Sequence, residues 1–139
     1  MNNIVLATDG SASSDAAARY LVDNPLLNRD FKVHVVHCEP NVTGDIRAFV
    51  SHDDVAAWHR DESEKAMRSV TEILRAGNIP AESHGLVGST AERIVEYSRS
   101  VGAIVIVMGS HHRGSFLNTI IGSVSSRVIA HAHCPVLLV

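Results

Sequence analysis

The amino-acid sequence predicts an α/β fold with a single doubly wound parallel sheet of five strands. Short apolar segments, several of them rich in Val and Ile, alternate along the 139 residues with segments of helical periodicity, in the order βαβαβαβαβ. Strands that alternate with helices in this way form a parallel sheet that is covered by helices on both faces. The sequence shows no internal repeat or linker, so we expect one domain over residues 1–139.

Five segments are predicted to be strands because they are short, mostly apolar or β-branched, and bounded by turn residues. They are residues 4–7, 32–38, 81–87, 103–108 and 136–139. The segment 103–108 is the most apolar, so we place it at the centre of the sheet beside 4–7. The segment 81–87 carries Glu82, Ser83 and His84, and this polarity favours an edge.

Four segments are predicted to be helices, and each carries terminal signals. They are residues 15–22, 53–76, 89–101 and 123–132, while 41–51 is expected to be a loop. Ser13 or Ser14 is expected to cap the first helix, and Gly77 to follow the second as its C′ residue. Ser89 and Glu92 match a capping box at the start of the third helix.

Right-handed crossovers between these strands favour the sheet order 3-2-1-4-5. In that order the winding reverses between the first and fourth strands, and ligands bind at the carboxyl ends of the strands beside such a reversal. The segments that follow these two strands are Thr8-Asp9-Gly10-Ser11 and Gly109-Ser110-His111-His112. The sequence therefore predicts a ligand site there.

Composition excludes several classes of function. The formal net charge is −3 and no run of Lys or Arg is present, which argues against a nucleic-acid-binding protein. No apolar run approaches the roughly 18 residues of a membrane span, and the N-terminus lacks the basic region of a signal peptide. Cys38 and Cys134 form no CxxC pair and are interpreted as buried free thiols. We therefore expect a cytoplasmic protein.

The segment after the fourth strand has the chemistry of a phosphate site. Its glycines let the backbone approach a ligand closely, and Gly122-Ser123-Val124 opens a helix whose free N–H groups and dipole favour an anion. Asp9, at the end of the first strand, is placed to accept a hydrogen bond from a ribose hydroxyl or a base amino group. Arg113 is the only cation in this segment, and no Walker A or GxSxG motif is present.

Three stretches of the chain resemble the universal stress protein family. They are the opening Ile4-Val5-Leu6-Ala7-Thr8-Asp9-Gly10-Ser11, the stretch Ile-Val-Met-Gly-Ser-His at 106–111, and the closing His133-Cys134-Pro135-Val136-Leu137-Leu138-Val139. Nucleotide-binding members carry the signature Gly, two residues, Gly, nine residues, Gly-Ser or Gly-Thr. Gly109 and Gly122-Ser123 match it in this chain, but His112 stands at the place of the middle glycine.

The resemblance implies a Rossmann-like fold of the adenine nucleotide alpha hydrolase-like type that binds ATP or AMP, with or without Mg²⁺. Carried over by position, base and ribose lie at the ends of the first two strands, and the phosphates lie on the glycine loop and the following helix. The candidate binding residues are Thr8, Asp9, Gly10, Ser11, Cys38, Met108, Gly109, Ser110, His112, Arg113, Gly114, Gly122, Ser123 and Val124.

Several of these residues also have a simpler interpretation. Asp9 and Ser11 are typical of a turn and a helix cap, Gly122-Ser123 of an N-cap, and Met108 of core packing. His112 either crowds the phosphates or contacts them. His111 with His112, and His131 with His133, lack the acidic partner that would indicate a metal site.

The last strand, Val136 to Val139, is apolar and is expected at an edge, where pairing with a second chain is favourable. The family commonly dimerises through this strand, so we expect an antiparallel homodimer. Three functions stay open. The first is a nucleotide-binding stress-response or signalling module with little or no hydrolysis, acting on an unknown protein partner. The others are a dimeric interaction protein that binds no nucleotide and a slow ATPase.

Overall fold

A computed structural model describes residues 1–24, 30–41, 52–110 and 122–139. The predicted loop at 41–51, apart from its first residue, lies outside these ranges, as do His111, His112, Arg113 and Gly114. The strands are β1 (Asn2–Ala7), β2 (Phe31–Glu39), β3 (Ala81–Val87), β4 (Ala103–Met108) and β5 (Val136–Leu138). They form one parallel sheet in the order β3-β2-β1-β4-β5, which confirms the predicted topology.

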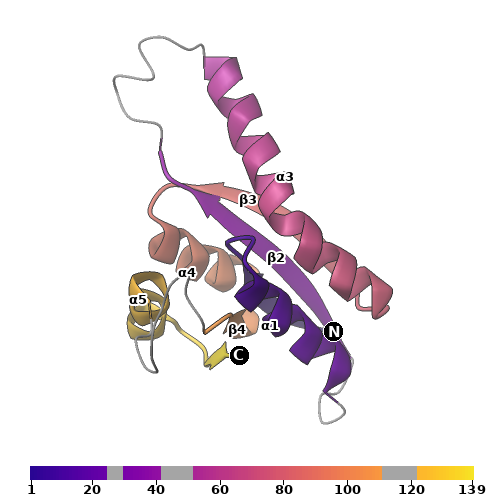
Figure 1. The fold of residues 1–139 in the computed structure, drawn as a ribbon. Coiled ribbons are helices and arrows are strands. Elements are labelled where there is room, and N and C mark those ends of the chain that lie inside the picture. Colours follow the sequence, from indigo (N-terminus) through magenta and orange to yellow (C-terminus); the bar gives the residue numbers. More distant parts are fainter. Residues whose placement is uncertain (25–29, 42–51, 111–121) are drawn as a thin grey trace.

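Among the described elements, two helices cover each face of the sheet (Figure 1). They are α1 (Ala12–Asp23) and α3 (His52–Ala76) on one face, and α4 (Thr90–Ser100) and α5 (Ser123–His131) on the other. No helix in the described part of the chain combines the length and the apolar character that crossing a bilayer requires.

The central strands carry apolar side chains on both faces of the sheet, because helices bury both faces. Leu6 of β1 packs with Leu21 of α1 and Leu74 of α3, whereas its neighbour Val5 packs with Ile94 of α4 and Val128 of α5. Successive side chains of a strand point to opposite faces, so a strand that is buried twice must be apolar throughout. Each fully buried side chain of this size contributes about 1.5–3 kcal/mol.

The helix ends differ from the predictions at two positions, and at a third the structure decides between two expectations. Ser11, which was expected as a helix cap in the simpler interpretation of the Asp9 turn, is the N-cap of α1 instead of Ser13 or Ser14, because its Oγ accepts from the Ser14 N–H at 3.4 Å. Ser89 is the N-cap of α4, but its side chain makes no capping hydrogen bond, so the predicted capping box does not form. The left-handed residue after α3 is Asn78 (φ 59°), because Gly77 still bonds to Ile73 in the helical pattern.

Candidate functional site

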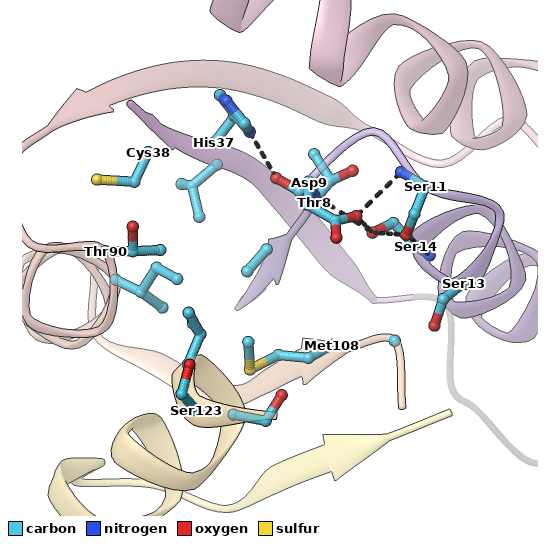
Figure 2. A pocket seen from close by; sticks show the side chains of 16 residues that line it. Thr8, Asp9, Ser11, Ser13, Ser14, His37, Cys38, Thr90, Met108 and Ser123 are labelled. Carbon is cyan, nitrogen blue, oxygen red and sulfur yellow. Dashed lines mark hydrogen bonds between the residues drawn. The ribbon is translucent and has the colours of Figure 1, made fainter. Parts of the chain in front are cut away.

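A cavity of about 280 Å³ lies at the carboxyl ends of β1, β2 and β4, where the strand order reverses. Its wall is drawn from the strand ends and from the first turns of α1, α4 and α5 (Figure 2). It is lined by Ala7, Thr8, Asp9, Ser11, Ser13, Ser14, Val36, His37, Cys38, Thr90, Ile94, Met108, Gly109, Ser123, Val124 and Ser125. Three helix N-termini therefore meet at one opening, and the positive ends of their dipoles favour an anionic ligand.

The turn from β1 into α1 is held by its own polar side chains. The Gly10 N–H donates to Thr8 Oγ1 at 3.0 Å, and Gly10 takes a left-handed conformation (φ 81°) that suits glycine. Asp9 Oδ1 accepts from the Ser11 N–H at 2.9 Å and from Ser14 Oγ at 3.1 Å. These bonds fix the Asp9 carboxylate beside the cavity, as Figure 2 shows.

The same hydrogen bonds set the charge of Asp9. Partial burial raises the pKa of this carboxyl, but the hydrogen bonds from Ser11 and Ser14 together outweigh burial and hold the pKa below its usual value of 3.8. Asp9 is therefore ionised at neutral pH. It is also the only carboxylate among the described residues that line the cavity.

The end of β2 supplies the opposite wall. Cys38 is buried, and its Sγ donates to the Gly88 carbonyl at 3.5 Å. Burial raises the pKa of the Cys38 thiol, so the thiol is protonated and unreactive at neutral pH. His37 joins β2 to β1, because its Nδ1 donates to the Thr8 carbonyl at 2.8 Å.

The end of β4 approaches α1 very closely. A Cβ placed on Gly109 would lie 2.6 Å from both the carbonyl carbon and the carbonyl oxygen of Ser13, which is closer than real Cβ atoms come. Only glycine fits at this position. At the same cavity, α5 begins after its N-cap Gly122, which has no side chain to make a capping hydrogen bond.

The structure brings most of the described candidate residues together. The predicted residues in the cavity wall are Thr8, Asp9, Ser11, Cys38, Met108, Gly109, Ser123 and Val124. Gly10 and Gly122 flank the wall in the turns described above. Ser110 points elsewhere, because its N–H and Oγ both donate to the Val139 carbonyl, at 2.8 and 2.9 Å. His112, Arg113 and Gly114 lie outside the described residues.

The sequence analysis did not predict several wall residues as binding residues, because they belong to no nucleotide-binding motif. Val36 and Ile94 are buried core residues whose edges reach the cavity. Ser13 and Ser14 were expected as helix caps, and Thr90 as part of a capping box. The alternation of side chains along a strand could have indicated Val36, because it lies two residues before Cys38 and shares its face.

Fold and site together define a doubly wound α/β protein whose cavity, at the reversal of strand order, is lined by both polar and apolar residues. The family model described as "Universal stress protein family" matches residues 1–139, so the chain belongs to the universal stress protein family. This confirms the resemblance noted in the sequence.

Individual relatives agree with this assignment. A universal stress protein of Methanocaldococcus jannaschii is 30% identical over 142 residues, which cover 98% of this chain and 80% of the relative. One from Mycobacterium tuberculosis is 27% identical, but the chain spans only 46% of its length. A solved structure of a universal stress protein from Archaeoglobus fulgidus, in complex with dAMP, is 26% identical with a TM-score of 0.71, covering 99% of this chain and 96% of that one.

Proposed function

We propose that this chain binds an adenine nucleotide in the cavity at the carboxyl ends of β1, β2 and β4. The observation that carries the proposal is the cavity itself, which lies at the sheet reversal and joins an apolar wall to three helix N-termini. The Archaeoglobus fulgidus relative, whose structure holds dAMP, supports an adenine nucleotide as the ligand. The cavity volume of about 280 Å³ is just below the usual range for small-molecule sites, about 300–1,000 Å³.

The wall offers a distinct environment for each part of such a ligand. The apolar edges of Val36, Ile94 and Met108 suit the base. Both hydrogen bonds from Ser11 and Ser14 reach Oδ1 of Asp9, so Oδ2 is the oxygen better placed to accept from a ribose hydroxyl or a base amino group. The phosphates fit the first turn of α5, where the N–H groups of the helix start are oriented toward an anion.

The test is calorimetric titration of the nucleotide-stripped protein with ATP, ADP and AMP, with and without Mg²⁺. Gly122→Asp places a carboxylate at the start of α5, and we expect it to weaken binding at least about tenfold by repulsion of the phosphates. Ala130→Asp is the matched control, because it adds the same charge on an exposed position of α5 away from the cavity. Equal loss in both variants, or no saturable binding by the unaltered chain, would contradict the proposal.

A variant at His112 distinguishes the two main alternatives, a nucleotide-binding protein and an interaction protein that binds no nucleotide. His112→Gly restores the family signature. Tighter binding by this variant would mean that the imidazole crowds the phosphates, and weaker binding that it contacts them. If neither the natural chain nor the variant bound a nucleotide, the function would have to be sought at the surface of the protein.

We further propose that hydrolysis is slow or absent, and that nucleotide occupancy acts as a stress-response or signalling state read by a protein partner. Rapid phosphoryl transfer needs several groups that position Mg²⁺ and neutralise charge. Asp9 alone among the described wall residues carries a carboxylate. Phosphate release that exceeds that of Gly122→Asp would overturn this part of the proposal.

The protein is also proposed to form a homodimer through β5. This strand is at the edge of the sheet, and Val136, Leu137, Leu138 and Val139 are all only partly buried. An apolar edge strand gains hydrogen bonds and apolar contacts when it pairs with a second copy across a two-fold axis. A monodisperse monomer in light scattering at micromolar concentration would rule the dimer out.

A further inference from the structure

Three metal-ligating side chains meet on the α4 face of the sheet, and none of them lines the cavity. They are His34 of β2 and Glu82 and His84 of β3, and their ligand atoms all lie within 4.8 Å of one another. His34 lies two residues before Val36 on the same face of β2, so the cluster is about 7 Å along the strand from the nearest residue of the cavity wall. We propose that His34, Glu82 and His84 form a binding site for a divalent transition-metal ion, with Zn²⁺ as the ion that fits best.

Two of the three distances between ligand atoms match a tetrahedral ion, and the third, between the two ring nitrogens, is within 4.8 Å. His34 Nδ1 lies 3.2 Å from Glu82 Oε1, and His84 Nε2 lies 3.4 Å from the same oxygen. Ligands at the usual zinc distances of about 2.0–2.2 Å are separated by about 3.3 Å when the coordination is tetrahedral. Two imidazoles and a carboxylate are a donor set that zinc accepts, whereas Mg²⁺ and Ca²⁺ prefer oxygen throughout.

The ring of His34 is oriented as a ligand by its neighbours. The Asn3 amide group donates through Nδ2 to the Val101 carbonyl at 2.7 Å, which leaves Asn3 Oδ1 facing His34 Nε2 at 3.1 Å. His34 Nε2 must therefore carry the proton and donate it, so Nδ1 presents a lone pair to Glu82. Metal-binding histidines commonly have such an acceptor on their second nitrogen. Burial lowers the pKa of His34, although Glu82 opposes this effect, and the neutral ring is the form that binds a metal.

The remaining neighbours are compatible with an ion. Lys32 Nζ lies 2.8 Å from Oε2 of Glu82, which leaves Oε1 directed toward the two rings. Burial raises the pKa of Tyr97 to about 12, so its hydroxyl stays protonated and can donate to His34 Nδ1 at 3.0 Å when no ion is bound. An ion at Nδ1 would replace that hydrogen bond.

Access and protein contacts also suit a metal site. Within the described ranges the buried Nε2 of His84 has no hydrogen-bond partner, although Glu82 Oε1 lies 3.4 Å from it. The His34 side chain is almost fully buried. On the edge strand β3, however, the side chains of Glu82 and His84 are 42% and 37% exposed. An ion can therefore enter from solvent, and three protein ligands leave one tetrahedral position for water.

The experiment titrates chelator-treated, nucleotide-stripped full-length protein with ZnCl₂ by calorimetry, and with CoCl₂ by visible absorption. We expect one tight site per chain, the intense absorption of tetrahedral Co²⁺, and a thermal midpoint that rises with Zn²⁺. Glu82→Gln and His84→Gln should each weaken Zn²⁺ binding at least about tenfold. The matched controls, Glu92→Gln and His131→Gln, change exposed residues outside the cluster and should leave the affinity unaltered.

Two further variants distinguish a metal site from a simple hydrogen-bond network. Asn3→Leu removes the acceptor for His34 Nε2 and should weaken Zn²⁺ binding about 10–100-fold. Tyr97→Phe keeps the ring against His84 but removes the competing hydroxyl, so this variant should bind Zn²⁺ at least as tightly as the natural chain. Unchanged affinity in both Glu82→Gln and His84→Gln, or no saturable Zn²⁺ binding by the natural chain, would overturn the proposal. Neither result depends on nucleotide binding, since no residue of the cluster lines the cavity.

Discussion

Gly109 at the end of β4 lies against the backbone of Ser13 in the first turn of α1, so closely that a Cβ on Gly109 would be 2.6 Å from the Ser13 carbonyl. The two residues are far apart in the sequence, and their contact joins two elements of the cavity wall. Close packing against Ser13 therefore explains why glycine stands at the first position of the family signature in this chain, whether or not a ligand binds.

Gly109→Ala tests this contact. Because backbone atoms have to move to admit the methyl group, we expect the free energy of unfolding to fall by about 1–3 kcal/mol and nucleotide binding to weaken. Urea denaturation and calorimetry measure the two effects. Adding Ser13→Gly removes the Ser13 hydroxyl but leaves its carbonyl in place, so it should restore only part of the stability. Full restoration would show that the side chain, and not the backbone, causes the clash.

Asp9 makes stability depend on pH in a defined direction. Hydrogen bonds from Ser11 and Ser14 outweigh the opposing effect of burial and hold the pKa of Asp9 in the folded protein below 3.8. The ionised carboxylate therefore stabilises the fold fully above 3.8, and this contribution is lost as the pH falls through the lower, folded value. Asp9→Asn keeps an acceptor oxygen but no charge, so it should be less stable than the natural chain at pH 7.

The difference in stability between Asp9→Asn and the natural chain should disappear well below pH 3.8, where the natural carboxyl is protonated as well. Chemical denaturation at a series of pH values measures it. Exposed Asp61→Asn on α3 serves as a control for the loss of one negative charge. A difference that persists at low pH would mean that the introduced amide fails for steric reasons.

The sheet and the position of the site could be predicted from the sequence because they depend on features that a linear pattern records. Polarity along each strand reports how deeply it is buried, and this alone distinguished the edge segment at 81–87 from the central one at 103–108. Once the order is known, the reversal between β1 and β4 brings Asp9 and Gly109 to one end of the sheet.

The cluster of His34, Glu82 and His84 could not be predicted in the same way. His34 and Glu82 are neighbours only because β2 and β3 pair in the register that sets them opposite each other. A shift of one residue would turn one of them to the α3 face, and no pattern in the sequence records that register. The sequence also left the cap of α1 open among Ser11, Ser13 and Ser14, and the hydrogen bonds of the Asp9 turn decide for Ser11.

The proposed dimer depends on backbone groups at the free edge of β5. Ile106 N–H donates to the Pro135 carbonyl and Val139 N–H to the Met108 carbonyl, both at 3.0 Å. Backbone groups of alternate residues point to opposite sides of a strand, so the N–H of Leu138 points away from β4. Leu138→Pro removes this donor without removing a bond to β4, and edge strands tolerate proline.

We expect Leu138→Pro to be a monomer in light scattering at a concentration where the natural chain is a dimer. Leu138→Ala is the matched control, because it shortens the side chain but keeps the N–H. If Leu138→Ala alone dissociated the dimer, apolar contacts rather than strand pairing would hold it together. If neither variant changed the molar mass, the chains would associate through another surface.

Cys38 and Cys134 offer a test of the binding site that requires no substitution. Cys38 lies in the cavity wall, whereas Cys134 lies outside it in the segment before β5. Burial raises the pKa of both thiols above 9.0, so alkylation by iodoacetamide should be slow at pH 7 and faster as the pH rises toward that value. A saturating adenine nucleotide should slow the alkylation of Cys38 further, because it covers that wall, and should leave the rate at Cys134 unchanged.

Peptide mass spectrometry of timed samples measures the two alkylation rates within one molecule, with Cys134 as the internal control. Equal protection of both thiols would indicate that the nucleotide stabilises the whole fold, and protection of neither would place the nucleotide somewhere other than the cavity.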